Sequence, residues 1–238
     1  MSIVDDAKTS LDPSLIRWGG YGLAAVGVAA VAYAWWRPGM LTTALALVLA
    51  LAPVGIGAAY PQLFEVNYRG GRGFNPIVGF AALVLLLLAL SLHLVDARPP
   101  WIAAFVVGAA LGAATWAAAQ APGLVSPIQA LLSVAIIGGV YGYGAYAVAD
   151  VRFDPSPGTA YQAAIVGKNT STSRSSTYYH LSLAPWGPVT AAASSVTVSK
   201  SVYDALQPGD PVCLTLHPGA MGTGWYDVAL CGGASGPA

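Results

Sequence analysis

The sequence predicts a membrane α-helical bundle of about five transmembrane helices, followed by a small all-β domain at the carboxyl terminus. Three observations lead to this fold class. Of the 238 residues, 56% are apolar and 8% are charged, whereas ordinary soluble domains have about 25% charged residues. Residues 18–149 contain no lysine and only two acids, Glu65 and Asp96. After residue 158 the chain changes to short runs rich in Val, Thr, Tyr and Leu, which are typical of β-strands.

Five apolar segments are long enough to cross a hydrocarbon core, which takes about 20 residues of helix. We expect these spans at residues 18–36, 40–60, 76–95, 101–120 and 127–149. None of them has a charged residue in its middle, and Trp or Tyr residues at several ends indicate interfacial belts. A four-helix alternative stays open, because the last two segments consist mainly of Ala and Gly.

Basic residues in the short connections predict the orientation of the bundle. Four lie on the side of the amino terminus: Lys8, Arg17, Arg69 and Arg72. Three lie on the opposite side: Arg37, Arg98 and Arg152. The side with more positive charge faces the cytoplasm. We therefore expect a multi-pass protein of the bacterial inner (cell) membrane, with a cytoplasmic amino terminus and a periplasmic carboxyl-terminal domain.

The rest of the chain divides by composition. An amino-terminal tail (1–17) precedes the transmembrane region (18–149), and a proline-rich linker (150–158) follows it. A β-domain is expected at 159–232 and a short tail at 233–238. Its strands are predicted at residues 161–166, 178–184, 196–200, 212–216 and 225–230. Five short strands predict a small barrel or open sheet of the OB or SH3 type.

Two cysteines, Cys213 and Cys231, are the only ones in the chain. If the last two strands form a hairpin centred on Gly222, residue 213 faces residue 231 and residue 216 faces residue 228. Facing Cα atoms lie about 4.5 to 5.5 Å apart, within reach of a disulfide. We therefore predict a Cys213–Cys231 disulfide, which fits an oxidising compartment. The alternative is a pair of reduced, buried thiols.

Three stretches of the β-domain carry a resemblance. They are Ser-Ser-Thr-Tyr-Tyr-His at 175–180, Pro-Trp-Gly-Pro at 185–188, and residues 203–231. In them the chain resembles the carboxyl-terminal parts of uncharacterised bacterial multi-pass membrane proteins that end in a cysteine-containing β-domain. The resemblance covers about a third of the chain. It implies this architecture and brings no activity with it.

The histidines give little support for catalysis. His93 lies beside Asp96 near the end of the third span, where a proton-relay or ligand role competes with that of an ordinary interfacial histidine. His180 and His217 have no metal-ligand spacing. No Gly-x-Ser-x-Gly motif accompanies the serines. We therefore expect a protein that is not an enzyme and that holds no cofactor or metal.

A glycine-rich loop between the second and third spans carries Glu65, Arg69 and Arg72. Two arginines on such a backbone could hold a partner or anionic lipid headgroups. The simpler interpretation is a flexible loop with positive-inside arginines. We keep the three residues as a candidate docking or headgroup-binding loop.

Glycines line the faces of several predicted spans. Those of the last two spans are Gly108, Gly112, Gly138, Gly139 and Gly142. Within lipid, small residues let helices approach closely, and packing is the main force that associates them. Some of these faces must serve the protein's own bundle. Their number nevertheless predicts an interface with other membrane protein subunits or with a second copy.

The expected function is that of a non-enzymatic integral membrane subunit or scaffold. It packs against other membrane proteins and presents an extracytoplasmic β-domain for binding. The expected partners are the lipid bilayer and other membrane chains or the protein itself. A net charge of zero argues against nucleic acid. The alternative function is a channel or transporter for a small neutral or lipid-like substrate.

Overall fold

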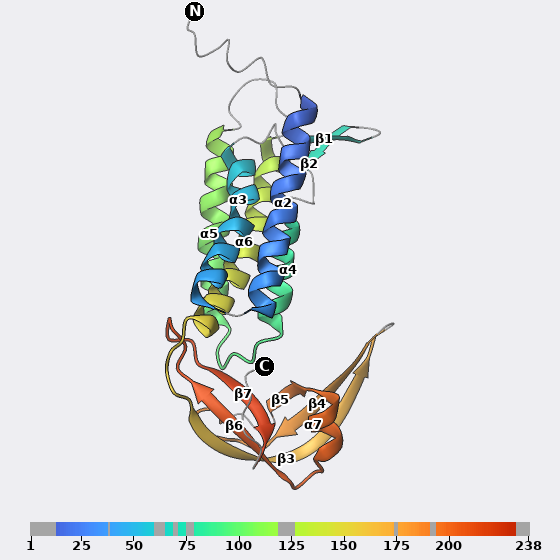
Figure 1. The fold of residues 1–238 in the computed structure, drawn as a ribbon, viewed down its shortest axis with the longest axis vertical. Helices are drawn as coiled ribbons and strands as arrows, with labels where there is room; N and C mark the ends of the chain where they lie inside the picture. Colours follow the sequence, from blue (N-terminus) through green and yellow to red (C-terminus); the bar gives the residue numbers. More distant parts are fainter. Residues whose placement is uncertain are drawn as a thin grey trace, which may run out of the picture. The chain divides into compact units, whose positions relative to one another are not determined.

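The computed structural model describes residues 13–37, 39–59, 65–68, 71–74, 79–118, 127–173, 176–190 and 194–231. The chain forms two compact units (Figure 1). The helical unit comprises Met1–Leu92 and Ala97–Phe153, and the β-unit comprises His93–Asp96 and Asp154–Ala238. The predicted order, helices followed by a carboxyl-terminal β-domain, is confirmed, and the sheet of this domain is antiparallel.

The helical unit packs its helices around α6 (Figure 1). The helices are α2 (Pro13–Trp36), α3 (Met40–Ala59), α4 (Phe80–Leu90), α5 (Arg98–Ala118) and α6 (Pro127–Arg152). Helix α6 contacts α3, α4 and α5, and α2 contacts α3 and α4. The Tyr141 hydroxyl donates a hydrogen bond of 2.9 Å to the carbonyl oxygen of Leu47, which ties α6 to α3. Between α3 and α4, β1 (Glu65–Tyr68) pairs antiparallel with β2 (Gly71–Phe74).

Local chemistry explains where two of the helices begin and end. Helix α5 begins at Arg98, with Pro99 and Pro100 in its first turn, where a missing N–H costs no helical hydrogen bond. Helix α4 ends at Leu90, five residues before the predicted end of the third span. The Ser91 hydroxyl donates to the carbonyl oxygen of Leu88 at 2.6 Å and so satisfies an acceptor at this end.

Two helical segments, Arg98–Ala117 and Leu131–Arg152, are long and apolar enough to cross a membrane. The other three helices of the helical unit contain shorter apolar stretches, at Ala25–Trp36, Met40–Ile56 and Phe80–Leu90. The 11 residues of α4 rise about 16 Å, against about 30 Å for a hydrocarbon core. A bundle of five spans therefore stays a prediction.

The core of the helical unit is built largely from small side chains. Its buried alanines are Ala34, Ala46, Ala50, Ala81, Ala82, Ala89, Ala104 and Ala147. Large apolar side chains lie outside instead, and those of Leu41 and Phe105 are 75% and 78% exposed. Helices in water bury such side chains and expose polar ones. Small residues inside and large apolar residues outside are typical of helices that pack within lipid.

The β-unit is a five-stranded antiparallel sheet in the order β5-β4-β3-β6-β7. Its strands are β3 (Thr159–Thr172), β4 (Thr177–Leu183), β5 (Ser194–Val198), β6 (Pro211–His217) and β7 (Trp225–Leu230). The first part of β3 pairs with β6 and the second part with β4, and the register shifts between Ile165 and Gly167. Such a bulge bends a strand, and the sheet curls into a half-barrel (Figure 1). The predicted five strands are thus found, without a closed barrel.

One face of the curled sheet holds the core of the β-unit. The buried side chains are those of Ala163, Ile165, Leu181, Leu183, Trp186, Val196, Leu206, Val212, Leu214 and Tyr226. Trp186 contacts Tyr226 edge to face, with the ring centroids 4.9 Å apart. Alternate residues of β3, β4 and β6 point into this core, as the period of a β-strand requires.

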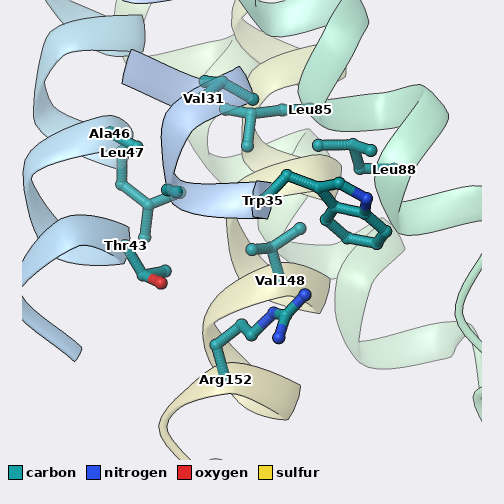
Figure 2. Close-up of a pocket in the computed structure, with 10 residues that line it drawn as sticks. Val31, Trp35, Thr43, Ala46, Leu47, Leu85, Leu88, Val148 and Arg152 are labelled. Atoms are coloured by element: carbon teal, nitrogen blue, oxygen red, sulfur yellow. The ribbon is translucent and has the colours of Figure 1, made fainter. Parts of the chain in front are cut away.

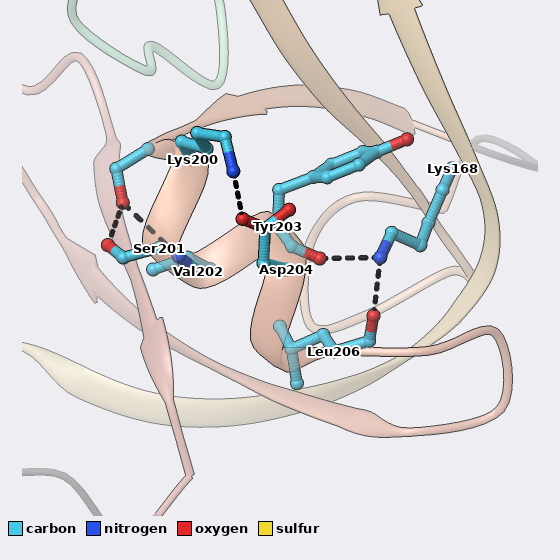
Figure 3. Close-up of polar contacts among 8 residues, drawn as sticks. Lys168, Lys200, Ser201, Val202, Tyr203, Asp204 and Leu206 are labelled. Atoms are coloured by element: carbon cyan, nitrogen blue, oxygen red, sulfur yellow. Dashed lines mark hydrogen bonds and ion pairs between the residues drawn. The ribbon is translucent and has the colours of Figure 1, made fainter.

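A short helix, α7 (Lys200–Ala205), connects β5 to β6 (Figure 3). The Lys168 ammonium of β3 donates hydrogen bonds to the carbonyl oxygens of Tyr203 and Leu206. It also lies 4.1 Å from the centroid of the Tyr203 ring. A cation suits the carbonyl end of a helix. Lys168 therefore fastens α7 to the sheet, and its charge has a structural role.

Candidate functional site

Cys213 and Cys231 form the predicted disulfide, with their Cα atoms 5.0 Å apart. The register behind the prediction was wrong by two residues. Cys213 faces Ala229, and Leu216 faces Tyr226. The turn is therefore centred on residue 221 and not on Gly222, and Cys231 lies just beyond β7. A shift of two residues leaves each side chain on the same face of the sheet, so the cysteines still meet.

The five predicted packing glycines all lie between α5 and α6. A Cβ atom on Gly108 would lie 2.7 Å from the carbonyl oxygen of Ala135, and one on Gly142 would lie 2.7 Å from that of Ala103. A Cβ atom on each of the other three would also lie within 3.4 Å of an atom of the opposite helix; these are Gly112, Gly138 and Gly139. These glycines thus serve contacts within one chain. An interface with another subunit stays a prediction and would need other faces.

The candidate docking loop is described only in part. Glu65 lies opposite Phe74, and Arg72 opposite Asn67, in the β1–β2 pair. Arg69 lies outside the described residues. The glycine-rich segment thus includes a short hairpin. The headgroup-binding role of Glu65, Arg69 and Arg72 stays a prediction.

His180 lies on β4 and His217 on β6, beside opposite ends of the long strand β3. His180 pairs with Asn169, while Leu216, the neighbour of His217, pairs with Thr159. Ten residues of strand span roughly 30 Å when extended. The two histidines therefore do not form a common site.

His180 instead takes part in a hydrogen-bonded chain across three strands. The Ser171 hydroxyl lies 2.8 Å from Nε2 of His180, and the Thr197 hydroxyl lies 3.1 Å from Nδ1. A serine beside a histidine is the nucleophile and base of many hydrolytic sites, but there a carboxylate usually orients the ring. Here a threonine hydroxyl takes that position. We interpret the chain as a polar tie between β3, β4 and β5.

His93 lies between the two edge strands of the half-barrel, β7 and β5. The connection between α4 and α5 contributes residues 93–96 to the β-unit, and we call this segment the clasp. Leu94 forms an antiparallel bridge with Trp225 of β7. The amide of Val95 donates to the carbonyl oxygen of Gly224 at 2.7 Å, and the amide of Tyr226 donates to that of His93 at 3.0 Å. The clasp thus adds a short strand to the β7 edge.

The His93 side chain extends the clasp to the other edge of the sheet. Its Nε2–H donates to the carbonyl oxygen of Thr197 in β5, at 3.1 Å. Its ring stacks on Tyr226 of β7, with the centroids 5.3 Å apart. Burial lowers the pKa of His93 below its ordinary value of 6.5, although the hydrogen bond to Thr197 and the charge of Asp227 oppose this shift. His93 was expected at a membrane interface, and its pairing with two strands escaped sequence reasoning.

Asp154, at the start of the second segment of the β-unit, forms hydrogen bonds with the β6–β7 connection and with β7. Its Oδ2 accepts hydrogen bonds from the amide of Gly219 at 2.8 Å and from Nε1 of Trp225 at 3.1 Å. Burial alone would raise the pKa of Asp154, but hydrogen bonds from Ser156, Gly219 and Trp225 outweigh it and lower the pKa below 3.8. His217 stacks on Trp225 at 4.1 Å. These contacts hold the end of β6 and the start of β7 in place. We therefore interpret the cluster around Asp154 as structural.

A small cavity lies inside the helical unit (Figure 2). Its volume is about 20 Å³, whereas small-molecule sites measure about 300 Å³ or more. Apolar side chains such as Val31 and Leu85 line it, and the Arg152 guanidinium lies 5.0 Å from the centroid of the Trp35 ring. A space of this size holds about one water molecule. It gives no support to the channel or transporter alternative.

Asp150 is a buried acidic residue at a position where the sequence predicted the linker. Helix α6 continues to Arg152, so Asp150 lies within its last turn. Its exposed fraction is 0%. The sequence did not predict that Asp150 is helical, because a polar residue next to a proline-rich stretch resembles the start of a linker.

The Ser194 hydroxyl is buried and has no hydrogen-bond partner among the residues that the structure describes. We expect Ser194→Ala to raise the free energy of unfolding of the β-unit by up to about 1 kcal/mol, because it removes an unsatisfied polar atom. Urea denaturation of the full chain in nanodiscs, followed by tryptophan fluorescence, measures this change. Ser195→Ala, at an exposed position, is the control and should change stability by less than about 0.5 kcal/mol. A loss of stability in Ser194→Ala would show that this hydroxyl is satisfied.

Within the described part of the chain, no group of three or more His, Cys, Asp or Glu side chains could hold a metal ion. Comparison with protein-family models, with curated proteins and with solved structures found no match.

Proposed function

We propose that the chain is a non-enzymatic integral membrane protein whose helices anchor the β-unit outside the cytoplasm, where the β-unit binds another protein chain. The outward large apolar side chains of the helical unit support the membrane anchor. Contacts of Arg152 with Trp35 and of Arg37 with Trp36 are typical of residues at a membrane–water interface. The Cys213–Cys231 bond supports an oxidising compartment for the β-unit.

The edge of β5 is the observation that carries the binding role. Among the described strands, β5 has β4 as its one neighbour. The carbonyl oxygen of Thr197 faces away from β4, because it accepts a hydrogen bond from His93. In an antiparallel pair every second residue turns both its N–H and its C=O outward. Ser195 therefore turns its backbone N–H and C=O to the same edge as Thr197, whose own carbonyl oxygen is bonded to His93.

The composition of β5 fits a binding edge. Its sequence, Ser-Ser-Val-Thr-Val, contains no charge and no proline, the devices that commonly protect an edge strand. An extended segment of another protein can pair with such an edge through backbone hydrogen bonds. The partner we propose is a strand of another membrane protein subunit or of a second copy of this chain.

A proline at residue 195 tests this edge. Ser195→Pro removes one outward N–H while leaving the bonds to β4 in place, and proline is tolerated on edge strands for this reason. Purified in mild detergent from its own membrane, the wild type should co-migrate with a second chain. Losing a backbone hydrogen bond of about 1 to 1.5 kcal/mol should weaken this association about tenfold.

Ser195→Ala, which keeps the N–H, is the matched control and should retain the partner. Circular dichroism of both variants shows whether the sheet is intact. A wild type that is strictly monomeric, or a proline variant that binds as well as the alanine variant, would contradict the proposal.

A further inference from the structure

The outward backbone groups of β5 differ in what they can offer to another strand. Within Ser194–Val198, Ser195 and Thr197 turn their N–H and C=O groups away from β4. The carbonyl oxygen of Thr197 already accepts a hydrogen bond of 3.1 Å from Nε2 of His93. A strand that pairs with β5 through Thr197 must therefore compete with His93 for this acceptor. A strand that pairs through Ser195 uses other groups.

We propose that the partner of this edge is β5 of a second copy of the chain, paired antiparallel about a two-fold axis at Ser195. The inference rests on the proposed binding role of the β5 edge and names the partner there. In such a pair Ser195 faces Ser195 of the other copy, and each N–H donates to the opposite carbonyl oxygen. Two copies of a chain most often meet across a two-fold axis, where the same surface serves both sides.

The bond from His93 selects this register among those that the outward residues of β5 allow. An axis at Val196 would pair Ser195 with Thr197 of the other copy, and an axis at Thr197 would pair Thr197 with itself. Both of these registers place their central hydrogen bonds on the carbonyl oxygen that His93 holds. An axis at Ser195 leaves that oxygen with His93, because its two central bonds join the serines alone.

The side chains of β5 suit pairing with their own copy. A two-fold axis places identical residues opposite each other at its centre, where a charged side chain would face a like charge and destabilise the pair. The sequence Ser-Ser-Val-Thr-Val has no charged residue. The Ser195 side chain is exposed, and hydroxyl side chains that face each other across two strands can exchange a hydrogen bond.

The pair is short, and this decides where it forms. Its centre has two backbone hydrogen bonds, and His93 competes for the next outward acceptor at Thr197. We therefore expect an association that is weak in detergent and stronger where both copies are held in one membrane. A covalent link formed in the membrane can trap such a pair.

Disulfide trapping in native membranes, with copper phenanthroline as the oxidant, tests the register. Ser195→Cys places two thiols in a directly opposed pair, whose Cα atoms lie about 5.5 Å apart, within reach of a disulfide. We expect a covalent dimer on a non-reducing gel. The wild type is the background control, because Cys213 and Cys231 are bonded to each other.

Thr197→Cys is the matched variant, at another exposed position of the same strand. With the axis at Ser195, the two copies of residue 197 lie four residues apart, roughly 14 Å along the strands. This is beyond the reach of a disulfide, so Thr197→Cys should stay monomeric. A dimer from Thr197→Cys, or none from Ser195→Cys, would overturn the inference.

Copies of the chain that carry two different tags in one membrane separate this inference from the proposed function. They also cover the case in which a cysteine variant does not fold. Wild-type copies should purify together. Ser195→Pro in both copies removes two N–H groups, so the tenfold loss expected for one bond becomes about a hundredfold.

Three results have distinct meanings in the experiment with tagged copies. Wild-type copies that purify together and separate with Ser195→Pro support the inference. If the wild type binds a different chain but not its own copy, and Ser195→Pro releases that chain, the inference fails and the binding role of the edge stands. If the wild type binds no chain, both fail.

Discussion

Replacing Gly142 with leucine is expected to lower the free energy of unfolding of the helical unit by about 3 kcal/mol, the upper end of the usual cost of overpacking. Even a Cβ atom at this position would lie 2.7 Å from the carbonyl oxygen of Ala103 and 3.0 Å from Cβ of Val107. The first of these atoms belongs to a helix backbone. It cannot move aside as the end of a flexible side chain can, so α5 and α6 must separate.

Titration with SDS from a mild detergent, followed by circular dichroism, measures this loss. Gly22→Leu in α2 is the matched control, because a Cβ atom there meets nothing within 4 Å. Leucine has a higher helix propensity than glycine, so Gly22→Leu should be neutral or slightly stabilising. Equal losses for the two variants would show that α5 and α6 do not pack through Gly142.

Removing the Cys213–Cys231 bond is expected to destabilise the β-unit by about 3 kcal/mol. The bond joins residues 18 positions apart, and closing a loop of this length restricts the unfolded chain by about that amount. Cys213→Ser, Cys231→Ser and the double variant should all lose the same free energy, because each removes the same single bond.

Urea denaturation of the three variants and of the reduced wild type measures the effect. The reduced wild type should match the variants. Losses that add up in the double variant would mean that the two thiols act separately. An oxidised wild type no more stable than the reduced one would remove the disulfide from the account of the β-unit.

Local pattern predicted the order of the elements because apolar length and strand period are local properties. The position of the last turn was harder to predict. Both Gly219 and Gly222 adopt positive φ angles in the connection between β6 and β7, so either glycine could mark a turn. The prediction centred the turn on Gly222 and missed the register by two residues. The cysteine pair survived because its face of the sheet was unchanged.

The polar contacts of the β-unit join residues that are far apart in the sequence, so no local pattern predicts them. His93 and Thr197 are 104 residues apart, and two helices and two complete strands lie between them in the sequence. The bond from Ser171 to His180 requires the register of β3 against β4. Gly108 and Gly142 were identifiable as packing residues from composition. The composition could not show whether these glycines pack against a helix of the same chain or of another chain.

Protease added to intact spheroplasts tests the central claim most directly, that the helical unit holds the β-unit outside the cytoplasm. With a tag at each end of the chain, we predict loss of the carboxyl-terminal tag and of the β-unit, while the amino-terminal tag and a cytoplasmic marker protein stay intact. If the β-unit is cleaved only after the membrane is ruptured, the proposed orientation and the extracytoplasmic binding role are contradicted together.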